Sequence, residues 1–270
     1  MSKKLAVLGA GNMGCAIVDG ILSSSIMSAD DIILVRRNTD KLLGYASKGC
    51  VVSDDVVFGA MTADVIILAV KPQMMSELFD RISSACKNKL VISIAAGILI
   101  ETVNNALPGN RIVRVMPNTP LTVGEGVTEI CRGENVTDED FSYVKSIFSS
   151  SGYVFECKES EMNALTALTS SAVAYFALVE KAMCQWAMDN GLSDYGKQEI
   201  CDLISKTAIG SSKLLFDKII TPEELIRSVA SPKGTTEQAL KVFEQSGIED
   251  IFDKAMTACL KRAEELSGSR

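Results

Sequence analysis

A glycine pattern near the start of the chain constrains the fold more than any other feature. An apolar run at residues 5–8 leads into Gly9-Ala10-Gly11-Asn12-Met13-Gly14, and an amphipathic run follows. This is the order of a strand, a tight turn and a helix, with Gly-x-Gly-x-x-Gly at the turn. The free N–H groups at such a helix start attract an anion. The pattern therefore predicts that these six residues bind the pyrophosphate of a dinucleotide; the alternative is a glycine-rich turn in another kind of α/β domain.

Further strand patterns occur throughout the first half of the chain. Apolar runs are found at residues 31–35, 49–52, 63–70, 89–94, 111–115 and 153–155, with helical patterns between most of them. Runs that are apolar on both faces are typical of a parallel sheet covered by helices. We therefore expect an α/β fold, a Rossmann-type dinucleotide-binding domain, over residues 1–160.

The pattern changes near residue 160, after which the remaining residues indicate helices only. One long helix is expected from residue 162 to residue 186, with Gly191 ending it. Thr221-Pro222-Glu223-Glu224 has the form of a capping box with proline at the first helical position. Residues 161–270 are accordingly expected to form an all-α domain, and this much apolar helical surface is typical of a subunit interface.

The second strand ends in a pair of arginines. A dinucleotide domain that prefers NAD usually has an acidic residue about 20 residues after the glycines, on the ribose hydroxyl. This chain has Arg36 and Arg37 at that place. Arginine suits a 2′-phosphate, so we expect NADPH as the cofactor, with NADH possible. The alternative is a solvated basic turn.

Composition excludes several kinds of function. The net charge is −7 and no basic patch is visible, so we expect no nucleic-acid partner. We find no run of about 18 apolar residues and no signal peptide, and therefore expect a cytoplasmic protein without a membrane span. Histidine is absent, which excludes imidazole ligands and histidine acid–base catalysis, and we expect no metal. The eight scattered cysteines do not suggest a disulfide framework.

Several motifs together resemble one known family. They are Gly9-Ala10-Gly11-Asn12-Met13, Ala69-Val70-Lys71-Pro72-Gln73, the run from Val91 to Ile98, Arg114-Val115-Met116-Pro117-Asn118-Thr119-Pro120, Val123-Gly124-Glu125-Gly126, Ala164-Leu165-Thr166-Ala167-Leu168 and Ser231-Pro232-Lys233-Gly234-Thr235-Thr236. With these motifs the chain resembles the pyrroline-5-carboxylate reductases along nearly its whole length.

This resemblance implies an activity and a set of site residues. The activity is the NAD(P)H-dependent reduction of 1-pyrroline-5-carboxylate to L-proline, the last step of proline biosynthesis, by homodimers that often assemble into decamers. Residues 161–270 would then be the dimerisation and substrate-binding domain. The resemblance places Ala69, Val70, Lys71, Pro72 and Ala95 at the nicotinamide side. It places Ser231, Thr235, Thr236 and Asn118 at the substrate, with Thr236 as the catalytic hydroxyl.

The chain departs from that family at three places. Ala172-Val173 stands where the family has Gly-Pro, Lys233 where it has glycine, and Val56 where it commonly has asparagine. From spacing alone, Thr235 and Thr236 would be an ordinary helix cap. Three hypotheses therefore stay open. The chain is a pyrroline-5-carboxylate reductase, a related reductase of another imine or keto acid, or a nucleotide-binding homologue without activity.

Overall fold

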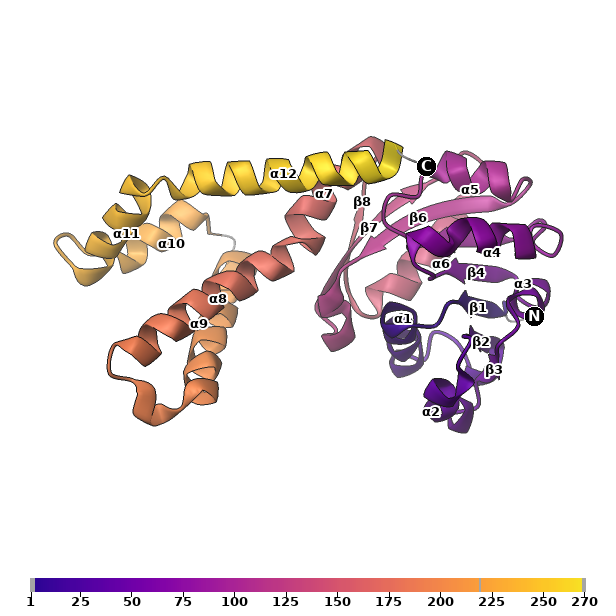
Figure 1. Ribbon diagram of the computed structural model, residues 1–270, viewed down its shortest axis with the longest axis horizontal. Coiled ribbons are helices and arrows are strands. Elements are labelled where there is room, and N and C mark those ends of the chain that lie inside the picture. Colours follow the sequence, from indigo (N-terminus) through magenta and orange to yellow (C-terminus); the bar gives the residue numbers. More distant parts are fainter. Residues whose placement is uncertain (1–2, 219, 269–270) are drawn as a thin grey trace. The chain divides into compact units, whose positions relative to one another are not determined.

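The computed structural model describes residues 3–218 and 220–268 (Figure 1). The outermost residues of the two expected domains, 1–2 and 269–270, lie outside the described residues. The chain forms two compact units. One contains the residues up to Ser170 together with those from Cys259 onward, and the other runs from Ser171 to Ala258. The segment between residues 161 and 170 belongs to the first unit. The expected division of the chain into two domains at residue 160 stays a proposal.

The first unit is built on one eight-stranded sheet with the order β3-β2-β1-β4-β5-β6-β7-β8. The strands are β1 Leu5–Leu8, β2 Ile32–Val35, β3 Val51–Ser53, β4 Val65–Leu68, β5 Leu90–Ser93, β6 Arg111–Pro117, β7 Gly126–Arg132 and β8 Gly152–Glu156. Neighbours are parallel except β6 and β7, which are antiparallel. The predicted Rossmann-type sheet is confirmed. Strand β7 was not expected, because Thr128 and Glu129 make it too polar to be recognised as a buried strand.

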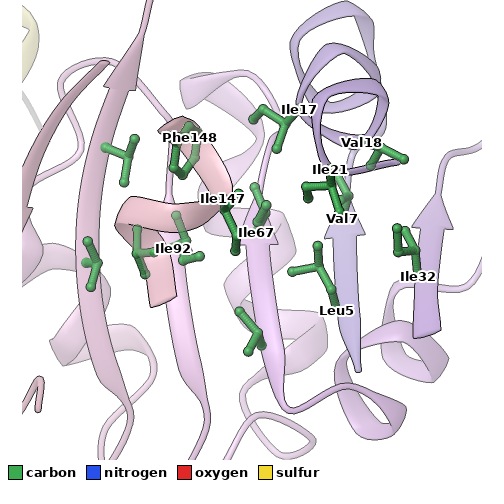
Figure 2. Close-up of a cluster of buried hydrophobic side chains, with 14 of the residues drawn as sticks. Leu5, Val7, Ile17, Val18, Ile21, Ile32, Ile67, Ile92, Ile147 and Phe148 are labelled. Carbon is green, nitrogen blue, oxygen red and sulfur yellow. The ribbon is translucent and has the colours of Figure 1, made fainter. Parts of the chain in front are cut away.

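Helices cover both faces of this sheet. Alternate residues of each strand point to opposite faces, so each strand contributes side chains to two buried clusters. Leu5 and Val7 belong to one cluster, which also contains Ile17 of α1 and Phe148 of α6 (Figure 2). Ala6 belongs to the other cluster, against α3, α4 and α5. These helices are α1 Asn12–Ser23, α3 Val56–Thr62, α4 Met75–Ile82, α5 Ile100–Ala106 and α6 Asp138–Ser149. The apolar strands are therefore buried on both faces, as a parallel sheet requires.

Short helical turns connect these elements. They are η1 Ala29–Asp31, η2 Thr39–Leu42, α2 Leu43–Ser47, η3 Pro72–Met74, η4 Thr119–Val123, η5 Glu159–Glu161, α7 Met162–Leu165 and η6 Thr166–Ser170. The last of these, η6, is a π-helical turn.

The single long helix expected from residue 162 is wrong, because the segment is divided into α7, the π-helical turn η6 and then α8. Thr166 and Thr169 each donate a side-chain hydrogen bond to a backbone carbonyl four residues earlier, at 2.7 and 2.8 Å. Such bonds compete with regular helix hydrogen bonding. The Thr169 hydroxyl also lies 2.5 Å from Glu129 of β7, which ties the turn to the sheet of its own unit.

The second unit is all helical, as predicted. It contains α8 Ala172–Asp189, η7 Ser193–Tyr195, α9 Lys197–Lys218, α10 Pro222–Val229, α11 Thr235–Gln245 and the first part of α12 Ile248–Gly268. The capping box at α10 is confirmed, with reciprocal bonds between Thr221 and Glu224. Its buried core is small, centred on Cys184, Ala187 and Ile200. Among residues 3–218 and 220–268, the eight cysteines form no disulfide with one another.

Large apolar side chains of the second unit are exposed on the single chain. Phe176 and Trp186 of α8 are 72% and 63% exposed, and Phe216 of α9 is 78% exposed. Within the described residues, one helical stretch, Glu159–Asp189, is long and apolar enough to cross a membrane by length and composition. The expectation that no such stretch exists is therefore wrong. By itself this is weak evidence for a membrane span, and an apolar helix that packs against another subunit has the same composition.

The loop before α11 contains a strained residue. Lys233 has φ of 61°, the left-handed conformation that costs a residue with a Cβ about 1–2 kcal/mol. Its side chain is exposed, and its backbone N–H donates to Glu237 at 2.8 Å. This is the position at which the family named above has glycine.

We expect Lys233→Gly to be more stable than Lys233→Ala by about 1 kcal/mol, because only glycine relieves the strain. Both variants keep the backbone N–H and remove the lysine side chain, so their difference isolates the conformation. Urea unfolding measures it. Equal stability of the two variants would contradict the left-handed assignment.

Candidate active site

A cavity of about 440 Å³ lies where the strand order reverses, at the carboxyl ends of β1, β2 and β4. Open α/β sheets bind ligands at this place. Seven of the predicted site residues line the cavity: Gly9, Gly11, Arg36, Arg37, Ala69, Val70 and Lys71. The structure therefore joins the glycine turn, the arginine pair and the end of β4 into one site.

The glycine turn fits a pyrophosphate in its backbone geometry. Gly9 has φ of 93°, and a Cβ there would lie 2.6 Å from the Cγ1 atom of Val70. Gly11 is the N-cap of α1 and has no side chain with which to cap it. A Cβ at Gly11 would project into open space, with its closest protein neighbour, the Gly9 carbonyl oxygen, 3.8 Å away. The start of α1 thus offers N–H groups to an anion that can approach closely.

The third glycine brings α1 close to the sheet. A Cβ at Gly14 would lie 2.9 Å from the Cγ1 atom of Val7 in β1. Real Cβ atoms do not approach this closely, so a larger residue would push the helix away from the strand. The predicted role of Gly14 in close helix packing is confirmed.

The two arginines differ in their surroundings. Arg36 is half-buried, and its Nη1 atom donates to the carbonyl of Ala10 in the glycine turn at 3.3 Å. Arg37 is exposed, and its Nη2 atom lies 3.9 Å from Glu77 of α4. The alternative of a wholly solvated basic turn does not describe Arg36, because its side chain is bonded to the glycine turn.

Sequence reasoning missed several residues of the cavity wall. Arg81 and Glu77 of α4 line it, as does Asp54 after β3. Glu77 and Arg81 are one helical turn apart, so a helix predicted after β4 already placed them on one face. Val56, the first residue of α3, also lines the cavity, so this departure from the family changes the wall beside the glycine turn.

The remaining first-unit residues predicted for the cofactor lie outside that wall. Asn12 and Met13 begin α1, Pro72 begins η3, Ala10 is buried in the glycine turn, and Ala95 is buried after β5. Their contacts with a cofactor stay predictions.

Asn118, at the end of β6, is buried and holds two neighbouring segments. Its Oδ1 atom accepts a hydrogen bond from the N–H of Val127 at 2.9 Å, and its Nδ2 atom donates to the carbonyl of Thr169 at 3.4 Å. Asn118 therefore links β6, β7 and η6. Its predicted contact with the substrate stays a prediction.

Ser231, Thr235 and Thr236 lie in the second unit. Thr235 and Thr236 are the first two residues of α11, and the N-cap is Gly234, which has no side chain. The alternative that either threonine is an ordinary helix cap is therefore wrong. The N–H of Gly234 donates to the carbonyl of Ser231 at 2.9 Å and closes the turn. The predicted contacts of Ser231, Thr235 and Thr236 with the substrate stay predictions.

Burial changes the acidity of two titratable groups near these segments. Burial raises the pKa of the Cys15 thiol in α1, and burial likewise raises the pKa of the Glu129 carboxyl in β7. Among residues 3–218 and 220–268, no group of three or more histidine, cysteine or carboxylate side chains could hold a metal.

We expect alanine at Gly9 and alanine at Gly11 to have different effects. Gly9→Ala forces a Cβ into Val70 at a positive φ, so we expect a loss of at least about 2 kcal/mol in stability. Gly11→Ala meets open space, so we expect stability within about 1 kcal/mol of the parent but weaker dinucleotide binding. Urea unfolding and calorimetric titration separate these effects. Unchanged dinucleotide binding by Gly11→Ala would contradict the assignment of the glycine turn to the pyrophosphate.

Two family models match the chain. "Pyrroline-5-carboxylate reductase dimerisation" matches residues 159–266, and "NADP oxidoreductase coenzyme F420-dependent" matches residues 4–97. The pyrroline-5-carboxylate reductase of Methanosarcina acetivorans is 35% identical over 268 residues, covering 98% of both chains. That of Escherichia coli is 32% identical over 272 residues and covers all of both chains.

Solved structures agree with these relatives. A pyrroline-5-carboxylate reductase from Coxiella burnetii superposes with a TM-score of 0.90 at 32% identity and covers 99% of both chains. The Plasmodium falciparum pyrroline carboxylate reductase, solved with NADP bound, superposes with a TM-score of 0.89 at 28% identity and also covers 99% of both. With its fold, its glycine cradle and these relatives, the chain belongs to the pyrroline-5-carboxylate reductase family.

Proposed function

We propose that this chain reduces 1-pyrroline-5-carboxylate to L-proline with NADPH. The observation that carries the proposal is the cavity that unites the glycine turn with Arg36 and Arg37, in a member of this family. When bound, NADPH supplies the hydride. The protein has to bind NADPH, orient it against the imine carbon of the substrate and hold the two close together.

Different groups of the protein bind the pyrophosphate and the 2′-phosphate of the cofactor. The N–H groups at the start of α1 bind the pyrophosphate, and Arg36 and Arg37 bind the 2′-phosphate of the adenosine ribose. The Arg37–Glu77 pair is long, at 3.9 Å, and both side chains are exposed. An exposed pair of this kind contributes little stability, so Arg37 is free to turn toward a phosphate. NADH, which lacks that phosphate, binds less tightly.

The substrate residues come from the other motifs of the resemblance. The free N–H groups at the start of α11, at Thr235 and Thr236, bind the carboxylate of the substrate, with Ser231 beside them. The hydroxyl of Thr236 contacts the ring nitrogen. Ala69, Val70, Lys71, Pro72 and Ala95 line the nicotinamide side, and Asn118 faces the same centre.

This chemistry suits a chain without histidine. A cyclic imine is partly protonated near neutral pH, and its carbon is then already electrophilic. Hydride transfer to it needs no strong general acid, so a hydroxyl such as that of Thr236 is sufficient to orient the nitrogen. Positioning is the main contribution of the protein.

The dimerisation match over residues 159–266 indicates an oligomer. We further propose a dimer formed through the second unit, assembled into decamers, in the cytoplasm. The support for the dimer is the exposed apolar surface of α8 and α9, including Phe176, Trp186 and Phe216. A second copy that covers these side chains accounts for the apolar character of residues 159–189 without a membrane.

The direct test is NADPH oxidation, followed at the nicotinamide absorbance band with pyrroline-5-carboxylate and with a panel of other cyclic imines and keto acids. We expect the highest kcat/KM with pyrroline-5-carboxylate and proline as the product. A better substrate elsewhere in the panel would identify a related reductase, in which Lys233 and Ala172-Val173 changed the substrate. Binding of NADPH without turnover of any compound would identify a homologue without activity.

The arginine pair gives a prediction on cofactor choice. In the double variant Arg36→Ala/Arg37→Ala, we expect KM for NADPH to rise about 100-fold, because two charge-assisted bonds to the 2′-phosphate are lost. KM for NADH should change by less than about threefold, and Arg262→Ala on α12 is the matched control. Steady-state kinetics with both cofactors measure this. Equal losses for the two cofactors would contradict the assignment.

A further inference from the structure

A buried carboxyl in β7 has no place in the chemistry above. Glu129 is fully buried, with 0% of its surface exposed. Its Oε2 atom has no hydrogen-bond partner among residues 3–218 and 220–268. A charged carboxylate with one oxygen unpaired in the core is costly, and a neutral acid is much less so.

The partner of its other oxygen indicates which form is present. The Thr169 hydroxyl lies 2.5 Å from Oε1 of Glu129 and 2.8 Å from the carbonyl oxygen of Leu165. A hydroxyl carries a single hydrogen, so it cannot donate a linear hydrogen bond to both oxygens. Both contacts are satisfied when Thr169 donates to Leu165 and accepts a hydrogen from a protonated Glu129.

This bond reaches a predicted substrate residue in one further step. Thr169 belongs to the π-helical turn η6, and its carbonyl accepts a hydrogen bond from the Nδ2 atom of Asn118. The Oδ1 atom of Asn118 accepts from Val127, two residues before Glu129 in the same strand. Glu129, Thr169 and Asn118 therefore form a closed path across β6, β7 and η6, and π-helical turns often lie at functional sites.

We propose that Glu129 is a positioning residue that acts as a neutral carboxylic acid, fixing η6 on β7 through Thr169 and thereby holding the carboxamide of Asn118 for the reduction. The catalytic part of this inference rests on the proposed function. The protonated state of Glu129 does not, since we infer it from hydrogen-bond geometry and burial alone.

The surroundings of Glu129 favour the neutral form. Burial is the largest cause of the raised pKa of its carboxyl, and a hydrogen bond that the neutral acid donates to Thr169 favours the same form. Neighbouring groups on its face are Cys131, on the same strand, and Arg114 of β6, whose charge is matched by Glu159 at 3.1 Å. Burial raises the pKa of Cys157, which follows β8, to about 11, with Cys131, Glu129 and Glu161 adding to the rise.

The sign of the pH effect follows from these states. In the unfolded chain Glu129 ionises above a pH of about 4.3, while in the native protein it keeps its proton to higher pH. Its contribution to stability is therefore complete in acid and is lost as the pH rises toward the native pKa. Over that window the unfolding equilibrium constant of the parent should rise about tenfold per pH unit relative to Glu129→Gln, which cannot ionise.

Three variants of the full chain test the proposal. Glu129→Gln keeps a neutral side chain that can donate to Thr169, and Glu129→Ala removes the donor. Glu156→Gln is the matched control, because Glu156 lies on the neighbouring strand β8 but is exposed and paired with Lys145 at 2.9 Å. The first readout is the infrared band of a protonated carboxyl at neutral pH. We expect it in the parent and in Glu156→Gln, and not in Glu129→Gln.

The second readout is kinetic. We expect Glu129→Ala to lower kcat about tenfold or more, since Asn118 loses its position, while Glu129→Gln stays within about threefold of the parent. KM for NADPH should be unchanged in both. The kcat of the parent relative to Glu129→Gln should fall at alkaline pH, and ionisation of the substrate imine, common to both enzymes, cancels in that ratio.

Two results would overturn the proposal. One is a missing infrared band in the parent, which would mean that Glu129 is ionised. The other is a Glu129→Ala variant that folds and has the same kcat as Glu156→Gln. A band in the parent without turnover of pyrroline-5-carboxylate would count against the proposed function alone, because the infrared readout needs no substrate.

Discussion

The close approach of the glycine turn to the end of β4 is the constraint on which the rest of the site depends. Gly9 adopts a positive φ with Val70 so near that a Cβ would lie 2.6 Å from its side chain. This brings the start of α1 beside Arg36 and Lys71 in one cavity. Because Gly11 leaves the helix start uncapped, the N–H groups there remain available to an anion.

A second layer of the site consists of polar groups buried where the sheet changes direction. The antiparallel pair β6 and β7 places Glu129 opposite Met116, and Asn118 just beyond the paired residues. The side chain of Asn118 is bonded to the carbonyl of Thr169, and the hydroxyl of Thr169 to Oε1 of Glu129, so these polar groups link the π-helical turn to the sheet. In this account the first layer selects the cofactor, and the second holds a substrate residue in place.

The sequence predicted the first layer well and the second poorly, for physical reasons. Strands buried on both faces and a glycine turn are local patterns, so the parallel sheet and the cavity at Gly9, Arg36 and Lys71 could be predicted. Strand β7 could not, because it buries Glu129, whose hydrogen-bond partner Thr169 is 40 residues away in the sequence. Thr169 of η6 takes part in the same contact.

The central claim is that this scaffold directs a hydride from NADPH to the imine carbon of pyrroline-5-carboxylate. The most direct measurement uses NADPH with deuterium at both C4 positions and determines the label in the product by mass spectrometry and NMR. The account predicts proline with one deuterium, on the ring carbon that is bonded to nitrogen and not to the carboxylate. Unlabelled proline, or no proline while NADPH remains bound, would contradict it.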